Sequence, residues 1–234
     1  MNLLLFIQDG LTEVVTTAAT APEVQEIKMN LFELVLKGGW LMIPIFLLLF
    51  VAIAVAIERT LVINKIGKED ATFMNRIKDY IYDGRIDSAL NLCRSENTPY
   101  SRMIEKGISR LGRPMNDVLV AIENVGNIEV AKLEKGFIWV ATTAGGAPMI
   151  GFLGTVTGMV RAFFDMANAG SNVDITLLSS GIYEALVTTV AGLVVGIIAL
   201  FAYNYLVSRV SGVVTKMETR SMEFMDLLNE PTKQ

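Results

Sequence analysis

Hydroxyl and carboxyl side chains occur at matched places in two long uncharged runs of this sequence. Thr155 lies in IWVATTAGGAPMIGFLGTVTGMV (138–160), and Thr189 lies in ALVTTVAGLVVGIIALFAYNYLV (185–207), which directly follows Glu184. A threonine hydroxyl can orient and relay a proton but cannot store one, whereas a carboxylate can bind and release one. These residue types in this setting favour the movement of protons over covalent catalysis.

The threonines of the two runs are expected to meet at common depths if the runs form antiparallel membrane helices. Thr155 lies six residues inside Arg161, and Thr189 lies five residues inside Glu184. At ~1.5 Å per residue, both hydroxyls lie roughly 7–9 Å below the outer boundary of the membrane. A second pair at matching depth is formed by Thr157 and Thr188.

Three more polar residues come to similar depth near the opposite, inner end of the runs: Thr142, Thr143 and Asn204. A plain packing role stays open for every threonine, because such residues in membrane helices commonly bond to a carbonyl of their own helix. Glu184 has two open alternatives to a role at the outer mouth of an ion path. One is an interfacial carboxylate favoured by the helix dipole, and the other is pairing with Arg161.

Small residues repeat at four-residue steps along both runs, which places them on one face of each helix. The stripes are Glu184, Thr188, Gly192 and Gly196 in one run, and Ala147, Gly151 and Thr155 with Gly154 and Gly158 in the other. Such patterns let two helix backbones approach closely within a membrane. We expect Gly145, Gly146 and Pro148 to loosen or bend the second run.

The elements that must position these residues are membrane helices. Together with Trp40 to Ile57, the sequence contains three uncharged runs that are long enough for a bilayer core of ~30 Å. The chain is 52% hydrophobic and only 19% charged, which fits three spans plus a water-soluble part. No long stretch alternates as a strand would, so the predicted class is all-α, with three transmembrane helices and a helical inner loop.

The composition excludes several enzyme classes. The 234 residues contain no histidine, which removes serine triads, histidine-based zinc sites and haem ligation. Cys93 is the single cysteine and is predicted to be a packing residue, since no histidine could activate it. Paired acids deep in the spans are also missing, so we expect no enzyme, no cofactor and no metal. No basic stripe with aromatic residues suggests nucleic acid.

The uneven distribution of Lys and Arg predicts the orientation. Seventeen of the 20 lie between the first two runs or after the third, and three lie on the opposite side. The positive-inside bias therefore puts the N-terminus outside and both the large loop and the C-terminus inside. The predicted order is an outer segment (1–30), a first membrane helix (31–65), an inner helical domain (66–130), a second membrane helix (131–162), an outer loop (163–180), a third membrane helix (181–207), and an inner C-terminal helix and tail (208–234).

The inner domain is expected to consist of helices broken at Gly- and Pro-containing segments. The predicted helices are 69–82, 86–96 and 99–111. Apolar residues at helical spacing predict a further helix over 115–135, and we expect it to run straight into the second span. The residues 208–228 are expected to extend the third span in the same way.

Three segments together resemble one known family. GFLGTVTGMVRAF (151–163), GIYEALVTTVAGLVVGI (181–197) and the YN pair (203–204) are similar to the ExbB/TolQ/MotA proton-channel family, most closely to its ExbB and TolQ branch. The motif resemblance covers about 131–210. One departure is GIIA (196–199), where that branch usually has an AIPA-like stretch.

The resemblance implies a pentameric ring in the bacterial inner membrane, with the outer side being the periplasm. A single-span ExbD- or TolR-like partner would bring a membrane aspartate, and proton flow would drive work on a TonB- or TolA-like protein. Thr155 and Thr189 match the family's pore threonines, and Glu184 matches its glutamate. Alternatives are a TolQ-like envelope-maintenance subunit, a gliding or secretion motor stator of the same family, or a membrane scaffold without ion flow.

Overall fold

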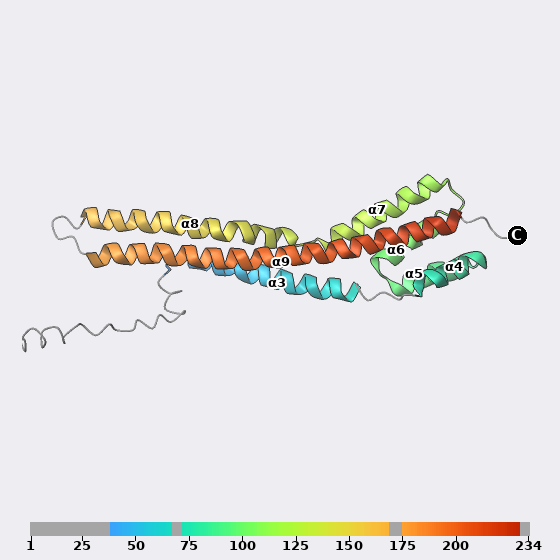
Figure 1. The fold of residues 1–234 in the computed structure, drawn as a ribbon, viewed down its shortest axis with the longest axis horizontal. Helices are drawn as coiled ribbons and strands as arrows, with labels where there is room; N and C mark the ends of the chain where they lie inside the picture. The colour runs from blue at the N-terminus through green and yellow to red at the C-terminus, as the bar shows by residue number, and fades with distance from the viewer. Residues whose placement is uncertain (1–37, 67–71, 169–174, 230–234) are drawn as a thin grey trace, which may run out of the picture. The chain divides into compact units, whose positions relative to one another are not determined.

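The computed structural model describes residues 38–66, 72–168 and 175–229, and within these ranges all regular structure is helical (Figure 1). The helices are α3 (Met42–Ile66), α4 (Phe73–Tyr82), α5 (Ile86–Glu96), α6 (Pro99–Ile108), α7 (Met115–Leu133), α8 (Phe137–Asn168) and α9 (Ile175–Asn229). The prediction for the outer segment 1–30 falls outside the described residues. The predicted all-α class is confirmed.

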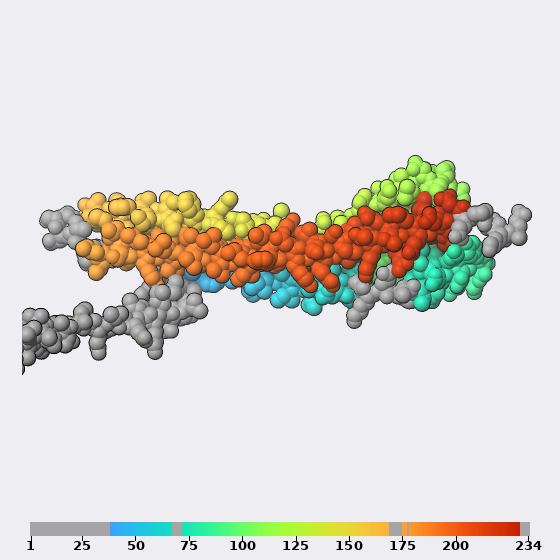
Figure 2. Space-filling view, in the orientation of Figure 1, coloured from blue at the N-terminus to red at the C-terminus, as the bar shows by residue number. Residues whose placement is uncertain are grey.

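Three of the described helices are long and apolar enough to cross a membrane: α3, α8 and the Leu178–Asn229 part of α9. Large apolar side chains project from all three, and Phe50, Phe152 and Phe201 are 71%, 66% and 72% exposed. Figure 2 shows that α9, in orange and red, is uncovered along much of the face in view. A surface of this kind must be covered by lipid or by protein, so the chain is a membrane protein.

The helices α8 and α9 form a long antiparallel pair, and α3 packs against both (Figure 1). Pro148 lies inside α8, yet the helix continues through it and through Gly145 and Gly146. The expected loosening therefore does not interrupt α8. A side chain on Gly196 of α9 would overlap the ring of Pro148, so the glycine makes room for the proline at this level.

The short helices follow the predicted breaks closely. The helix predicted over 86–96 is α5, and Asn97 ends it in the left-handed conformation at φ 49°. Thr98 then caps α6: its hydroxyl accepts from Ser101 N, and the Ser101 hydroxyl accepts from Thr98 N. Such a reciprocal capping box satisfies two backbone donors that a helix start would leave unpaired. Of the helix predicted over 69–82, residues 69–71 lie outside the described ranges, and α4 begins at Phe73.

The prediction that the helix over 115–135 runs straight into the second span is wrong. The helix α7 ends at Leu133, and α8 begins at Phe137. Gly136 between them has φ +92°, a conformation that breaks a helix and that suits glycine. The Arg59 guanidinium of α3 donates to Lys132 O at 3.3 Å and so takes up a carbonyl at the end of α7. By contrast, α9 continues without a break to Asn229, as expected for 208–228.

The short helices α4 to α6 and α7 share one apolar core with the last part of α9. Phe73, Ile104, Ile122 and Phe224 are each almost fully buried, and they come from α4, α6, α7 and α9. Burying such side chains stabilises a fold by roughly 1.5–3 kcal/mol each. The end of α9 is therefore packed against α4, α6 and α7 rather than standing free.

Candidate functional site

Glycine and alanine residues form the seam between α8 and α9. A Cβ on Gly192 would lie 2.5 Å from Ala147 O, and a Cβ on Gly151 would lie 2.9 Å from Thr188 O. Both neighbours are backbone atoms, which cannot move aside cheaply. Two further glycines of α8 take part in the same seam, Gly154 against the Thr188 side chain and Gly158 against Ala185. The four-residue stripes of the sequence thus face one another across the helix pair.

Two adjacent threonines of α9 stand at this seam with different partners. The Thr189 hydroxyl donates to Gly151 O of α8 at 2.8 Å. The Thr188 hydroxyl is buried and donates within its own helix to Ala185 O at 2.8 Å. The Thr189 side chain is only half-buried, so its oxygen remains open to a further group. A hydroxyl that donates its proton still has lone pairs with which to accept a hydrogen bond.

The threonines of α8 bond to their own helix. The Thr155 hydroxyl donates to Phe152 O at 2.6 Å, and the Thr157 hydroxyl donates to Leu153 O at 2.9 Å. Such bonds are the pattern expected of packing threonines. Thr155 is half-buried and Thr157 is exposed, so neither hydroxyl is sealed inside the helix pair. Because Thr189 bonds to Gly151, it lies about one helical turn from Thr155 along α8.

A small polar cavity of about 60 Å³ lies toward the end of the pair where α8 ends and α9 begins. Glu184, Arg161, Thr157 and Thr188 line it together with the turn that precedes α3. The volume has room for a few water molecules beside polar partners. Although Glu184 and Arg161 line the same cavity, the structure shows no ion pair between these two described residues.

The turn before α3 is part of this site, although sequence reasoning did not identify it. Gly39 has φ +67°, and a Cβ at that position would overlap Oε1 of Glu184. A larger residue would strain this backbone and push the carboxylate aside, so glycine suits the turn beside Glu184. The signal in the sequence was the Gly-Gly-Trp segment (38–40) at the start of the first apolar run.

At the opposite end of the pair, predicted to be the inner mouth, the structure separates Thr143 from Thr142 and Asn204. Thr143 is fully buried, and its hydroxyl donates to Trp139 O at 2.9 Å and lies 3.3 Å from Leu48 O of α3. It faces α3, so its geometry is that of a packing residue. Thr142 and Asn204 are exposed.

The membrane part of the site contains hydroxyls but hardly any group that can store a proton. The runs 138–160 and 185–207 hold no Asp, Glu, His, Lys or Arg. Among the described residues no group of His, Cys, Asp and Glu could hold a metal ion. The site offers hydroxyls and small residues along the seam, with the Glu184 carboxylate in the polar cavity at one end.

Comparison with known proteins agrees with this arrangement. Residues 95–219 match the model of the MotA/TolQ/ExbB proton channel family. The chain is 30% identical over 176 residues to a biopolymer transport protein described as ExbB-like 1 from Synechocystis sp., covering 74% of this chain and 69% of that protein.

Two other relatives carry the names of different branches. The Tol-Pal system protein TolQ of Haemophilus influenzae is 26% identical over 86% of this chain and 95% of its own length. The biopolymer transport protein ExbB of Xanthomonas campestris pv. campestris is 36% identical over 42% of this chain and 38% of its own length. The matched region contains α6, α7 and α8 whole and most of α9. It therefore includes the α8–α9 seam and its hydroxyls, whereas the turn before α3 that completes the polar cavity lies outside it. This chain therefore belongs to the MotA/TolQ/ExbB proton channel family.

Proposed function

We propose that this chain forms the wall of a proton path in a membrane motor and that a partner helix supplies the acid that carries the proton. The observation that carries the proposal is the Thr189 hydroxyl, half-buried at the α8–α9 seam and bonded to Gly151 O. It lies in the run 185–207, which has no Asp, Glu, His, Lys or Arg. It can therefore accept a hydrogen bond from a protonated group but cannot hold the proton itself.

The missing ionisable group points to a second chain. Burial of a carboxylic acid in an apolar span raises its pKa, which suits an acid that alternates between charged and neutral forms. Thr189 and Thr155 are the residues proposed to face this acid, with Thr188 behind them. Their hydroxyls would orient the neutral acid and water beside it. No covalent intermediate is needed, and the chain acts as a channel subunit rather than an enzyme.

Glu184 and its cavity are proposed as the outer entrance of the path. The carboxylate lies with Arg161 around a space of about 60 Å³, where water and a proton can meet. Thr142 and Asn204 are proposed at the inner mouth, since both are exposed near the other end of the pair. Close packing of α8 against α9 is proposed to depend on five glycines: Gly151, Gly154, Gly158, Gly192 and Gly196.

The partner proposed here is a single-span protein like ExbD or TolR, which would bring a membrane aspartate into a homopentamer of this chain. The work would pass to a TonB- or TolA-like protein across the periplasm, as in TonB-dependent outer-membrane transport. The proposed place is the bacterial inner membrane, with the N-terminus periplasmic and the C-terminus cytoplasmic. This orientation is supported by the 17 Lys and Arg residues on the inner side, against three outside.

Three further functions are alternatives. A TolQ-like role in envelope maintenance is favoured by the match to TolQ over 86% of this chain, and a gliding or secretion motor stator would use the same path. A scaffold without ion flow is favoured by the bonds of Thr155 and Thr157 to their own helix.

Proton flux through reconstituted liposomes separates a channel subunit from a scaffold without ion flow. Liposomes under a pH gradient would hold either the purified chain or the chain co-expressed with its single-span partner. We expect flux only with the partner, because an apolar wall of small residues excludes water. An Asp→Asn change in the partner should abolish the flux. Fast flux from this chain alone would refute the wall hypothesis, and absence of flux in both samples would favour the scaffold.

A further inference from the structure

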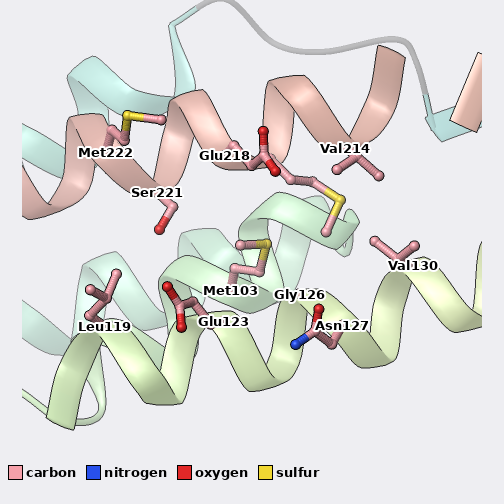
Figure 3. A pocket seen from close by; sticks show the side chains of 11 residues that line it. Met103, Leu119, Glu123, Gly126, Asn127, Val130, Val214, Glu218, Ser221 and Met222 are labelled. Atoms are coloured by element: carbon pink, nitrogen blue, oxygen red, sulfur yellow. The ribbon is translucent and has the colours of Figure 1, made fainter. Parts of the chain in front are cut away.

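A groove of about 360 Å³ lies between α7 and α9, outside the polar site (Figure 3). Its apolar lining includes Leu119 and the exposed Met222, with the largely buried Met103 and Met217 beneath them, and Asn127 and Ser221 add polar groups. Methionine side chains are flexible and polarizable and adapt to different apolar partners. The size and the lining therefore suit apolar side chains of another segment.

Both charged residues that line the groove are acidic. Glu123 comes from α7 and Glu218 from α9, on opposite sides of the groove, with Met103 of α6 between them (Figure 3). Both glutamates are exposed, and the described residues offer neither of them an ion-pair partner. Two unpaired carboxylates around an apolar floor favour a cationic and amphipathic occupant.

Gly126 leaves space at the bottom of the groove because it has no side chain. A Cβ there would lie 3.1 Å from the Met103 Cε and 4.0 Å from the Met217 Cε. Any larger side chain at this position would fill the space between α7 and α9. The groove thus depends on one glycine in the middle of a helix, where glycine is otherwise unfavourable by about 1 kcal/mol relative to alanine.

We propose that this groove binds the basic inner flank of the membrane-spanning partner. The identity of this bound segment rests on the proposed function, in which a partner helix crosses the same membrane. By the positive-inside bias, residues that follow such a helix on the inner side are rich in Lys and Arg. The groove lies between α7 and the inner extension of α9, on that same side in the proposed orientation. Apolar residues of the flank would contact Leu119 and Met222, and its cations would pair with Glu123 and Glu218.

Binding of a designed peptide to the purified full-length protein in a neutral detergent tests this directly. The probe is a fluorescent amphipathic helix of about 15 residues built from Leu and Lys. A peptide of the same composition in scrambled order is the first control, and a Leu/Glu peptide is the second. Anisotropy should detect binding of the amphipathic Leu/Lys peptide alone. Equal binding of the scrambled peptide would overturn the proposal.

Two double variants are compared: one neutralises the two acids that line the groove, and the other neutralises two acids elsewhere on the surface. Glu123→Gln with Glu218→Gln should weaken peptide binding about tenfold at low salt, with a smaller loss at high salt. Asp79→Asn with Asp117→Asn changes the net charge equally on exposed residues that do not line the groove, and should leave binding within about twofold. Equal losses in both variants would mean a general charge effect and would overturn the proposal.

A third variant tests the apolar half of the groove. Gly126→Val should block peptide binding without a change of charge. If this variant does not fold, peptide binding by the Glu123→Gln with Glu218→Gln variant still tests the proposal. If Glu123→Gln with Glu218→Gln changes the oligomeric mass of the protein, the occupant is a second copy and the proposal fails.

The groove and the proton path can fail separately. Thr189→Val should bind the peptide normally, whatever its flux. Fast proton flux from this chain without its partner, or normal flux through Thr189→Val, together with intact peptide binding would refute the proposed function alone. Partner-dependent flux without peptide binding would refute the groove alone.

Discussion

The hydroxyl of Thr189 on α9 donates a hydrogen bond to the carbonyl oxygen of Gly151 on α8 across a distance of 2.8 Å. This bond joins residues 38 positions apart and is possible because Gly151 has no side chain between the helices. The bond fixes the direction of the hydroxyl proton and leaves the oxygen lone pairs for a neighbour. One small residue thus connects helix packing to the chemistry of the proposed path.

Gly192→Ala should destabilise the helix pair. The new methyl group would lie 2.5 Å from Ala147 O, and backbone atoms cannot shift without separating α8 from α9. We expect a loss of about 1–3 kcal/mol in the free energy of unfolding, measured by thermal unfolding in detergent. Gly212→Ala is the matched control, because a Cβ there meets nothing within 4 Å on the same helix. Equal stability of both variants would contradict the close packing.

Gly39→Ala should displace the Glu184 carboxylate. The methyl group would overlap Oε1, and the positive φ adds backbone strain of about 1–2 kcal/mol. Gly84→Ala is the control, since Gly84 has φ +69° but nothing within 4 Å of a Cβ. We expect only Gly39→Ala to reduce proton flux in the assembled complex.

A double-mutant cycle identifies the cause of this loss. In a Glu184→Ala background, Gly39→Ala should lower flux no further, because the clash is gone. Additive effects of the two substitutions would mean that Gly39 acts independently of Glu184.

Several features could be predicted from the sequence because they depend on local patterns. The three long helices follow from uncharged runs, and the start of α6 follows from the Thr98-Pro99 pair. The facing glycine stripes follow from four-residue spacing. Each of these signals lies within one helix or at its end.

Other features depend on residues far apart in the sequence and could not be predicted. The break at Gly136 is associated with Arg59, 73 residues before the carbonyl that it contacts. Apolar periodicity continues across the break, so the pattern alone predicted a continuous helix. Similarly, Thr142 and Thr143 are neighbours in sequence, but only contact with α3 reveals that Thr143 is buried.

Cys93 should be unreactive in the folded protein. Burial, with the nearby Glu105 carboxylate as a second cause, raises the pKa of its thiol from 9.0 to about 12. Since the thiolate is the reactive form, its fraction should stay negligible at pH 8 and increase only as the pH approaches 12. A thiol reagent at pH 8 should label the protein after denaturation and not before. Rapid labelling of the native protein would contradict the buried position.

The orientation predicts which residues a membrane-impermeant maleimide can reach. In a Cys93→Ser background, Asn168→Cys should be labelled in intact cells and Ser109→Cys only after the cells are opened. Both positions are exposed in the structure, so burial cannot explain a difference between them. Labelling of Ser109→Cys in intact cells would show that the orientation is the opposite of the one proposed.

The central claim is that the Thr189 hydroxyl takes part in proton movement. Thr189→Val keeps the shape of the side chain, removes the hydroxyl, and costs about 0.6 kcal/mol of interhelical bonding, too little to prevent assembly. Thr60→Val is the matched control, because the Thr60 hydroxyl on α3 donates to Ala56 O within its own helix. The measurement is proton flux through liposomes that contain each variant together with the partner. We predict that Thr189→Val removes most of the flux while Thr60→Val retains it, and normal flux through Thr189→Val would contradict the claim.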